Sequence, residues 1–384
     1  MARAKKFTRP TKPPSRLPLH EGILKHYLLE FTPLFENWQE SGNFPQSILL
    51  TGTKGNRKED FAHYLCQWLN CHVSSPKLNF SPESETFNLF GEEPNVSKMK
   101  NPTPCGVCPE CKRALGNNWI DVINIRPESA VEGRAGLIRI DALVPIQSTL
   151  GFGPSEAPFK IILIEKCETM TTQAANALLK TLEEPMKDWI FILTASDTTR
   201  VPSTIMSRCQ RFNSAPLSVA LTKSILIRDG VEEEKANLIA HLSSGNLDKA
   251  ADMAEGDYWN HRQNIAAVLS NSNSAANTLI EFAGKNVAHL NQIIDQLELI
   301  VKDGLLLVTN QDHSNTQPHL VNKDLETSIN KFIKSSKKHQ TSLFWFDRFR
   351  DIQEIRHKIH APLNRKILSQ ELIIPWLSLQ EGQR

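Results

Sequence analysis

The sequence predicts an α/β domain with a parallel β-sheet in the first half of the chain and all-helical domains in the second half. Between Ser47 and Thr194, short apolar segments alternate with segments of helical periodicity. Continuous apolar segments are typical of strands buried on both faces, so the helices between them are expected to cover both sides of the sheet. Beyond Pro216 the strand pattern fades and apolar residues recur at helical spacing.

The composition is that of an ordinary globular protein without a strong overall charge. Its 384 residues allow two or three domains, and 40% hydrophobic with 22% charged residues excludes fibrous and wholly disordered classes. Lys and Arg number 44 against 42 Asp and Glu, so the net charge of +2 indicates no particular class of partner. No segment approaches the ~18 apolar residues of a membrane span, and the basic start lacks a secretory signal. We therefore expect a cytoplasmic protein with no membrane contact.

The chain begins with a basic tail, residues 1–18, which contains several prolines and no acidic residue. Such a segment buries little apolar surface and is expected to be disordered. We interpret it as a solvated tail rather than a nucleic-acid-binding arm, because short basic ends are common in proteins without such a partner.

The strands and helices of the α/β domain follow from periodicity. The predicted strands are 47–50, 121–125, 161–164 and 189–194. A helix near 58–70 follows the first strand, because apolar residues recur at i, i+3, i+4, i+7 and i+8 from Phe61. Another helix begins after a cap at Thr171 or Thr172, ends at Pro185, and has one apolar face: Ala175, Leu178, Leu179 and Leu182. Both apolar faces are interpreted as core.

The helical half is divided by turn residues at 229–230, by 244–246 and by a polar stretch at 310–317. We expect an α/β domain over 19–216, a small helical domain over 217–257 and a larger helical domain over 258–384. Segment 72–104 is rich in Ser, Pro, Asn and Glu and lacks sustained periodicity, so it is interpreted as an insertion into the α/β domain.

The loop 51–59 lies between a predicted strand and a predicted helix, where a phosphate-binding loop would be. In such loops glycines let backbone N–H groups surround the phosphates, a Lys reaches the terminal phosphates, and a Ser or Thr hydroxyl binds Mg²⁺. The residues at plausible phosphate-binding positions are Gly52, Gly55 and Lys58. However, Arg57 replaces the expected glycine, and Glu59 replaces the metal-binding hydroxyl. The loop shape is expected to persist while its nucleotide chemistry is lost.

The strand 161–164 ends where a nucleotide hydrolase would carry an acidic pair. The first carboxylate faces Mg²⁺ and the second polarises the attacking water. Glu165 fills the first position, but Lys166 fills the second, and a protonated Lys cannot accept a proton from water. Together with the altered loop, this substitution argues against ATP hydrolysis by this chain.

Three cysteines at two-residue gaps, Cys105, Cys108 and Cys111, predict a metal site. Tetrahedral Zn²⁺ needs four ligands, so the fourth must come from elsewhere, and Cys71 is the natural candidate, with Cys66 and His72 nearby. An iron–sulfur cluster is disfavoured because nothing else in the sequence suggests redox chemistry. A closed four-thiolate site has no open position, so its role would be structural.

The segment Ser207-Arg208-Cys209 contains an arginine with two interpretations. Arg208 is either an ordinary surface residue or a cation that stabilises a transferring phosphoryl group in the site of a neighbouring subunit. The three residues alone favour the surface interpretation.

Considered together, several motifs resemble the bacterial DNA polymerase III clamp-loader subunits over about residues 20–250. These are Gly52-Thr-Lys-Gly, Leu69-Asn-Cys71, Pro104-Cys-Gly-Val-Cys-Pro-Glu-Cys111, Ala174-Ala-Asn-Ala-Leu-Leu-Lys-Thr-Leu-Glu-Glu-Pro185 and Ser207-Arg-Cys209. The resemblance implies a RecA-like AAA+ domain with a zinc module, a small helical lid domain and a helical collar domain that holds a hetero-pentameric ring. Within the family, the altered loop resembles the delta-prime type rather than the gamma/tau ATPase.

The resemblance also implies roles for individual residues. Cys71, Cys105, Cys108 and Cys111 match the zinc ligands, and Arg208 matches the arginine finger donated in trans to the ATP of a gamma/tau neighbour. Asp248 stands where ATPase members carry a nucleotide-sensing Arg. The implied function is a catalytically silent stator that assembles with the gamma/tau and delta subunits and helps to load the sliding clamp onto primed DNA.

Two other functions are weighed against this one. The first is a divergent gamma/tau-type ATPase acting through Lys58 and Glu165. The second is a separate zinc-dependent nucleic-acid-binding protein, which is disfavoured because aromatic residues make up only 7% of the chain and basic residues are not concentrated outside the tail. The segment Thr86–Phe90 is similar to short clamp-binding peptides, although its Phe and Leu side chains are better explained by docking on their own domain.

Overall fold

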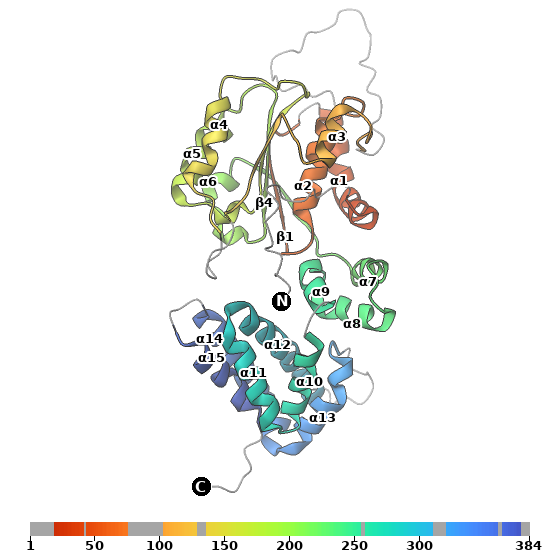
Figure 1. Ribbon diagram of the computed structural model, residues 1–384, viewed down its shortest axis with the longest axis vertical. Coiled ribbons are helices and arrows are strands. Elements are labelled where there is room, and N and C mark those ends of the chain that lie inside the picture. The colour runs from red at the N-terminus through yellow and green to blue at the C-terminus, as the bar shows by residue number, and fades with distance from the viewer. Residues whose placement is uncertain are drawn as a thin grey trace, which may run out of the picture. The chain divides into compact units, whose positions relative to one another are not determined.

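A computed structural model describes residues 19–41, 44–75, 103–128, 136–254, 258–309, 320–359 and 363–377. The basic tail, the segment Thr86–Phe90 and the polar stretch 310–317 lie outside these residues. The chain forms two compact units, Met1–Leu217 and Ser218–Arg384, drawn in Figure 1. The first unit contains the β-sheet, and every regular element described in the second is helical.

The first unit is built on a five-stranded parallel sheet with the order β2-β3-β4-β1-β5. The strands are β1 (Ser47–Gly52), β2 (Val122–Ile125), β3 (Lys160–Ile164), β4 (Trp189–Ala195) and β5 (Gln210–Ser214). Every residue of β3 and β4 is buried, as expected for central strands of a parallel sheet covered on both faces. The predicted parallel sheet is confirmed.

The edge strand β5 was not predicted from the sequence. It pairs in parallel with β1, with Ile48 opposite Gln210 and Gly52 opposite Ser214. Its sequence, Gln-Arg-Phe-Asn-Ser, buries only Phe212 and Ser214, because β5 has one neighbouring strand and an exposed side. A strand with a single large apolar residue lacks the hydrophobic signal on which the other predictions depend.

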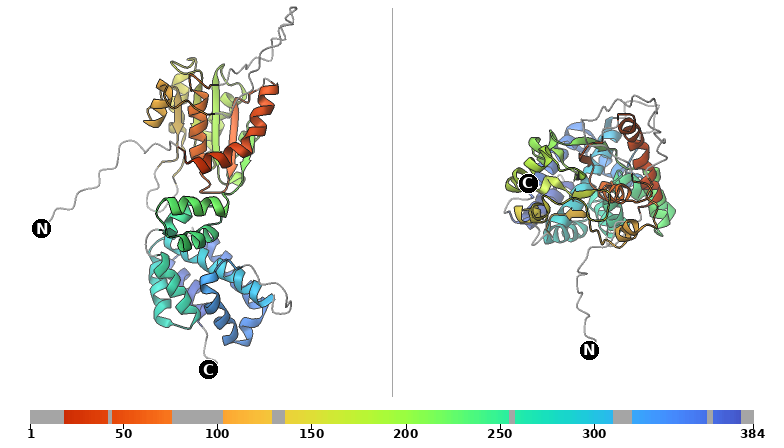
Figure 2. Two further views of the ribbon diagram at one scale, coloured as in Figure 1. Left: turned by 90° about the vertical axis from the view of Figure 1, so that its right-hand side faces the viewer. Right: turned by 90° about the horizontal axis from the view of Figure 1, so that it is seen from above.

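Helices cover both faces of this sheet. On one face lie α1 (Glu21–Ser41), α2 (Lys58–Leu69) and α3 (Pro109–Leu115), and on the other lie α4 (Val144–Thr149), α5 (Thr172–Glu183) and α6 (Ser203–Met206), as Figure 1 shows. Short 3-10 turns are η1 (Ile140–Leu143), η2 (Cys167–Thr169) and η3 (Thr198–Arg200). In the left view of Figure 2, the red and orange helices α1 and α2 lie in front of the sheet.

Helix α1 is held on α2 by aromatic contacts. The rings of Tyr27 and Phe61 stack with centroids 4.5 Å apart, and Phe31 lies 4.8 Å from Phe61. Tyr27, Phe31 and Phe35 recur every four residues and form the buried side of α1. On the opposite face, α5 begins at the predicted cap, where the Thr171 hydroxyl accepts a hydrogen bond from the Ala174 N–H at 3.3 Å.

A buried aspartate fixes the connection that leads into β3. The carboxylate of Asp121 accepts hydrogen bonds from three consecutive backbone N–H groups, those of Ser155, Glu156 and Ala157, at 2.7 to 2.9 Å. Burial alone would raise the pKa of Asp121, but these N–H groups and Lys160 outweigh it and lower the pKa. Asp121 is therefore charged in the folded protein and ties residues 155–157 to the start of β2.

The second unit contains nine α-helices among its described residues. They are α7 (Val219–Arg228), α8 (Glu233–Ser243), α9 (Leu247–Ala254), α10 (Tyr258–Leu269), α11 (Asn273–Lys285), α12 (Val287–Thr309), α13 (Glu326–Ser335), α14 (Ser342–Lys358) and α15 (Arg365–Ile373), with 3-10 turns η5 (Lys323–Leu325), η6 (Lys337–Gln340) and η7 (Ile374–Trp376). One apolar cluster unites α7 to α9 and another unites α10 to α15. The helical second half predicted from the sequence is confirmed.

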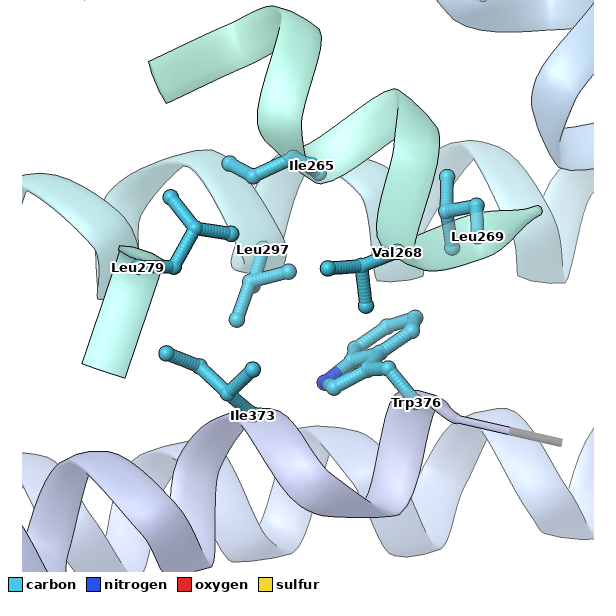
Figure 3. Close-up of a pocket in the computed structure, with 7 residues that line it drawn as sticks. All are labelled: Ile265, Val268, Leu269, Leu279, Leu297, Ile373 and Trp376. Atoms are coloured by element: carbon cyan, nitrogen blue, oxygen red, sulfur yellow. The ribbon is translucent and has the colours of Figure 1, made fainter. Parts of the chain in front are cut away.

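Close packing in the larger cluster depends on a glycine. A Cβ atom added to Gly304 of α12 would lie 2.2 Å from Cζ3 of Trp345, whose side chain is fully buried. Figure 3 shows a small cavity elsewhere in this cluster, and its lining is Ile265, Val268, Leu269, Leu279, Leu297, Ile373 and Trp376. Without convergent polar groups, such a cavity is an imperfection of core packing rather than a ligand site.

Ion pairs within the second unit join α9 to α12 and α14. Nζ of Lys249 lies 2.9 Å from Oδ2 of Asp295, and Nη2 of Arg356 lies 3.0 Å from Oδ1 of the same carboxylate. Among the described helices of both units, none is long and apolar enough to cross a membrane.

Candidate functional site

The candidate nucleotide loop lies at the carboxyl edge of the sheet, between β1 and α2. A Cβ added to Gly52 would lie 2.5 Å from Nδ2 of Asn56 and from Oγ of Ser214, so this position has room for glycine alone. Gly55 has a φ of 75°, in the left-handed region that glycine adopts without steric cost. Both predicted glycines are therefore required by the shape of the loop.

The lysine of the loop is bonded to oxygens of its own chain. Lys58 is fully buried, and its Nζ donates to Oγ of Ser196 at 2.6 Å and to the carbonyl of Thr53 at 3.3 Å. The carboxylate of Glu59 lies 3.4 Å away. Phosphate binding would require the ammonium group to exchange these partners for phosphate oxygens.

The start of α2 is already supplied with negative charge. Arg57 precedes the helix with a φ of 67°, a conformation that costs a non-glycine residue roughly 1–2 kcal/mol. Glu59 and Asp60 stand in the first turn, where carboxylates stabilise the positive end of the helix dipole. Because phosphate would occupy the same end, these carboxylates would repel it.

The loop is also fastened to α1 and β5 by side chains that sequence reasoning did not identify. The buried Asn56 donates from Nδ2 to Oγ of Ser214 at 2.6 Å, and the Tyr27 hydroxyl donates to the carbonyl of Asn56 at 2.9 Å. Burial raises the pKa of Tyr27, so its hydroxyl keeps its proton and remains a donor. The loop is therefore held in one shape by its own domain.

Glu165, the residue at the first acidic position, lies in a buried polar network. Its side chain is 2% exposed, and its Oε1 accepts hydrogen bonds from Nε of Arg126 at 2.7 Å, Nε2 of His63 at 2.9 Å and Nδ2 of Asn124 at 3.3 Å. Asn124 lies on β2, which pairs with β3, and Arg126 follows two residues later on the same face. A carboxylate that binds a metal ion must be accessible to that ion, but the Glu165 carboxylate is enclosed by these donors.

The second acidic position is also filled in an unusual way. Lys166 is exposed, with a φ of 56°, and its backbone N–H donates to Oγ1 of Thr194 at 3.0 Å. The next carboxylate, Glu168, accepts a hydrogen bond from the N–H of Ser196 at 3.1 Å. Ser196 thus links Glu168 to Lys58. Position 166 itself carries a lysine, so the second carboxylate of the acidic pair is missing there.

The structure brings together the four cysteines predicted as metal ligands. The sulfur atoms of Cys71, Cys105, Cys108 and Cys111 all lie within 4.8 Å of one another. The Cys105 and Cys111 sulfurs are 4.0 Å apart. A tetrahedral site with Zn–S bonds of about 2.3 Å requires sulfurs about 3.8 Å apart, so this spacing suits such a metal. The other two candidates, Cys66 and His72, are not in the cluster.

Local backbone geometry creates the cysteine cluster. Cys71 lies just past the end of α2, and Cys108 caps α3, where its sulfur accepts a hydrogen bond from the Cys111 N–H at 3.5 Å. The N–H of Cys105 donates to the Cys71 sulfur at 3.3 Å, and the N–H of Cys108 donates to the Cys105 sulfur at the same distance. Donors aimed at sulfur stabilise thiolates, which are the metal-binding form.

The protonation of the cluster is uneven when no metal is bound. Burial acts to raise the pKa of Cys71, but the Cys105 N–H and donors from residues 73–74 outweigh it and lower the pKa to about 6. Burial raises the pKa of Cys111, and the negative charge of Cys71 adds to this effect. A divalent cation would displace the remaining protons, and four soft thiolates could bind a metal such as zinc.

Arg208 lies at the opposite edge of the sheet from the loop. It follows α6 and precedes β5, and because Gln210 pairs with Ile48, it sits near the amino end of β1. The loop begins after Gly52. Four strand residues at about 3.3 Å each separate Ile48 from Gly52, so the amino and carboxyl ends of β1 are about 13 Å apart. Arg208 is half exposed, and its Nε donates to Oε1 of Glu183 at 2.7 Å. It therefore cannot serve the loop of its own chain.

Asp248 lies in the second unit, in the first turn of α9. It is exposed, and a carboxylate at this place complements the helix dipole. The turn before α9 uses two left-handed residues, Ser244 with a φ of 50° and Gly245 with a φ of 80°.

Comparison with known proteins gives consistent matches. A family model described as "DNA polymerase III, delta subunit" matches residues 78–218. The DNA polymerase III subunit delta' of Bacillus subtilis is 28% identical over 288 residues, which cover 73% of this chain and 82% of that relative. The DNA polymerase III subunit tau of Escherichia coli is 26% identical over 265 residues, which cover 65% of this chain.

The extent of these matches differs. This chain spans 36% of the length of the Escherichia coli tau relative. Among solved structures, a DNA polymerase III gamma subunit-related protein from Thermotoga maritima is 18% identical with a TM-score of 0.37, and the match covers 89% of this chain and 98% of that one.

Proposed function

This chain is a clamp-loader subunit of the DNA polymerase III family, and we propose that it is a catalytically silent member of the delta-prime type. In this proposal it is a cytoplasmic AAA+ stator that assembles with gamma/tau and delta subunits in a hetero-pentameric ring. The ring loads the sliding clamp onto primed DNA, and this chain donates Arg208 in trans to the ATP of its neighbour.

The observation that carries the proposal is that Glu165 and Lys58 are already bonded to groups of their own chain. Three donors from the protein converge on one oxygen of Glu165, and Lys58 is buried against Ser196 and Thr53. Binding of Mg²⁺ and triphosphate would require both residues to give up these partners, while Glu59 and Asp60 oppose the added negative charge. This geometry supports a loop that has kept the shape of a phosphate-binding loop but does not bind Mg²⁺ and triphosphate.

The position of Arg208 supports action in trans. An arginine finger can supply about 10³- to 10⁵-fold in turnover when its guanidinium reaches the transferring phosphoryl group. Because Arg208 lies at the amino edge of the sheet, about 13 Å or more from its own loop, only the site of another subunit is within its reach.

The four cysteines are proposed to hold a structural Zn²⁺. Bound there, zinc would cross-link the end of α2 to α3, and the closed set of four thiolates would leave no position for a substrate.

The experiment that tests the proposal is Arg208→Ala in the assembled clamp loader. Turnover at the neighbouring site that receives Arg208 is expected to fall by at least tenfold, which lowers the turnover of the complex, while the assembly elutes unchanged on size exclusion. Arg211→Ala is the matched control, because Arg211 is an exposed arginine on β5. Equal turnover of the Arg208 variant and the unmodified complex would remove the finger role.

A second candidate function is that of a divergent gamma/tau-type ATPase, which the similarity to tau favours. It predicts tight, Mg²⁺-dependent ATP binding by the isolated chain that is lost in Lys58→Ala and retained in Lys54→Ala, where the exposed lysine of the same loop is removed. The silent-subunit proposal predicts no such binding in equilibrium dialysis.

A further inference from the structure

The guanidinium group of Arg208 is already engaged within the chain. Its Nε lies 2.7 Å from Oε1 of Glu183, and its Nη2 donates to the same oxygen. On the other side, Nη1 donates to the carbonyl of Thr204 at 2.9 Å and to Oγ of Ser207 at 3.3 Å. Since a guanidinium has five N–H groups, these four bonds leave too few donors for a phosphoryl group unless one partner is displaced.

The partners differ in how easily they can be displaced. Thr204 and Ser207 belong to the same short turn as Arg208 and move with it. Glu183 is the last residue of α5, a separate helix, and its side chain is 47% exposed. Water can solvate the Glu183 carboxylate when the arginine leaves, so an exchange costs little.

Glu183 occupies the part of the guanidinium that an incoming phosphate would use. The edge formed by Nε and Nη2 is one that matches a carboxylate or phosphate with two parallel hydrogen bonds. Here both nitrogens are bonded to a carboxylate oxygen of the same chain. The carboxylate and the neighbour's triphosphate are therefore competing anions.

We propose that Glu183 is a positioning residue that holds Arg208 back in the unassembled chain and gives way to the triphosphate of the neighbouring subunit. The proposal rests on the trans role proposed above. It means that Glu183 lowers the apparent affinity of the neighbour's site for ATP. Once Glu183 is displaced, Arg208 makes the same contact with the transferring phosphoryl group as it would in a variant without the Glu183 carboxylate. The value of kcat should therefore not depend on Glu183.

The test is the ATP dependence of hydrolysis by the assembled clamp loader carrying Glu183→Gln. The amide keeps the size of the side chain but loses the charge, so KM for ATP is expected to fall roughly two- to fivefold with kcat unchanged, the range set by exposed ion pairs. The effect should shrink at high salt, where exposed charges are screened. Glu184→Gln is the matched control, because the described contacts include no bond from Glu184 to Arg208.

The outcomes separate this inference from the trans role. If Arg208→Ala lowers kcat while Glu183→Gln leaves KM unchanged or raises it, the restraining role is wrong and the finger role stands. If Arg208→Ala has no effect on either constant, the finger role fails. If Glu183→Gln changes KM even in the Arg208→Ala background, Glu183 acts by another route and the inference is overturned.

Discussion

Removal of Arg126 should destabilise the first unit through the carboxylate that it partners. Glu165 is 2% exposed, and the 2.7 Å bond from Nε of Arg126 is the shortest of the three hydrogen bonds to its Oε1 described above. In Arg126→Met the aliphatic stem is retained, but a buried carboxylate loses its guanidinium. Hydrogen bonds to charged groups contribute about 1.5–3 kcal/mol, and the 25% exposure of Arg126 lets water replace part of this interaction. We expect the free energy of unfolding to fall by about 2 kcal/mol.

The measurement is urea unfolding of the full chain, followed by hydrogen exchange of the β2 and β3 amides, because two units need not unfold in one step. Arg139→Met is the control, since Arg139 pairs with Glu128 at 3.2 Å and both side chains are 59% exposed. That variant should change stability by no more than about 0.5 kcal/mol.

The coupling between Arg126 and Glu165 provides the decisive comparison. If the charge is the cause, Glu165→Gln should recover part of the stability lost in Arg126→Met, because a neutral amide needs no cationic partner. Equal losses in the Arg126 and Arg139 variants, or strict additivity of the double variant, would refute the reasoning.

Three further predictions concern the metal site, the acid stability and the packing of the second unit. The purified full chain should contain one zinc by elemental analysis, lose it in Cys111→Ala and keep it in Cys66→Ala; zinc retained in the Cys111 variant would contradict the four-thiolate site. Because the folded protein lowers the pKa of Asp121, this residue should stabilise the fold above the unfolded pKa of about 4 and lose that contribution as the pH falls through the folded pKa, so Asp121→Asn should flatten the acid limb of a stability–pH curve. Gly304→Ala should cost about 1–3 kcal/mol in calorimetry, because the new methyl group would overlap Trp345; an unchanged melting temperature would show that the helices separate freely.

The sequence predicted most of the sheet because its central strands are continuous apolar segments. The strands 161–164 and 189–194 are buried throughout, and hydrophobic runs of this kind need no knowledge of their neighbours. Strand β5 failed this criterion because it pairs on one side and buries a single large side chain, Phe212. Edge strands are recognised by their partner, which a linear pattern does not contain.

The candidate site was predicted to the extent that its residues are local in sequence. The loop glycines and the three closely spaced cysteines were identified from their spacing, and Cys71 joins them in the structure across a separation of 34 residues from Cys105. The spacing alone left Cys66 and His72 as candidates, because distance along the chain does not show which sulfur faces the cluster. The bonds from Glu165 to His63 and Arg126, and from Arg208 to Glu183, depend on sheet order and helix packing.

The placement of the loop and Arg208 at opposite ends of β1 gives the first unit a polarity. If the loop end of such a domain receives an arginine and the Arg208 end donates one, similar domains can associate only head to tail, which is a heterologous and directional contact. If the receiving end is closed by its own side chains, as proposed here, no upstream neighbour gains from docking there. Such a subunit would stand at one end of the head-to-tail series of subunits. The ring would then have a gap next to the closed loop of this subunit.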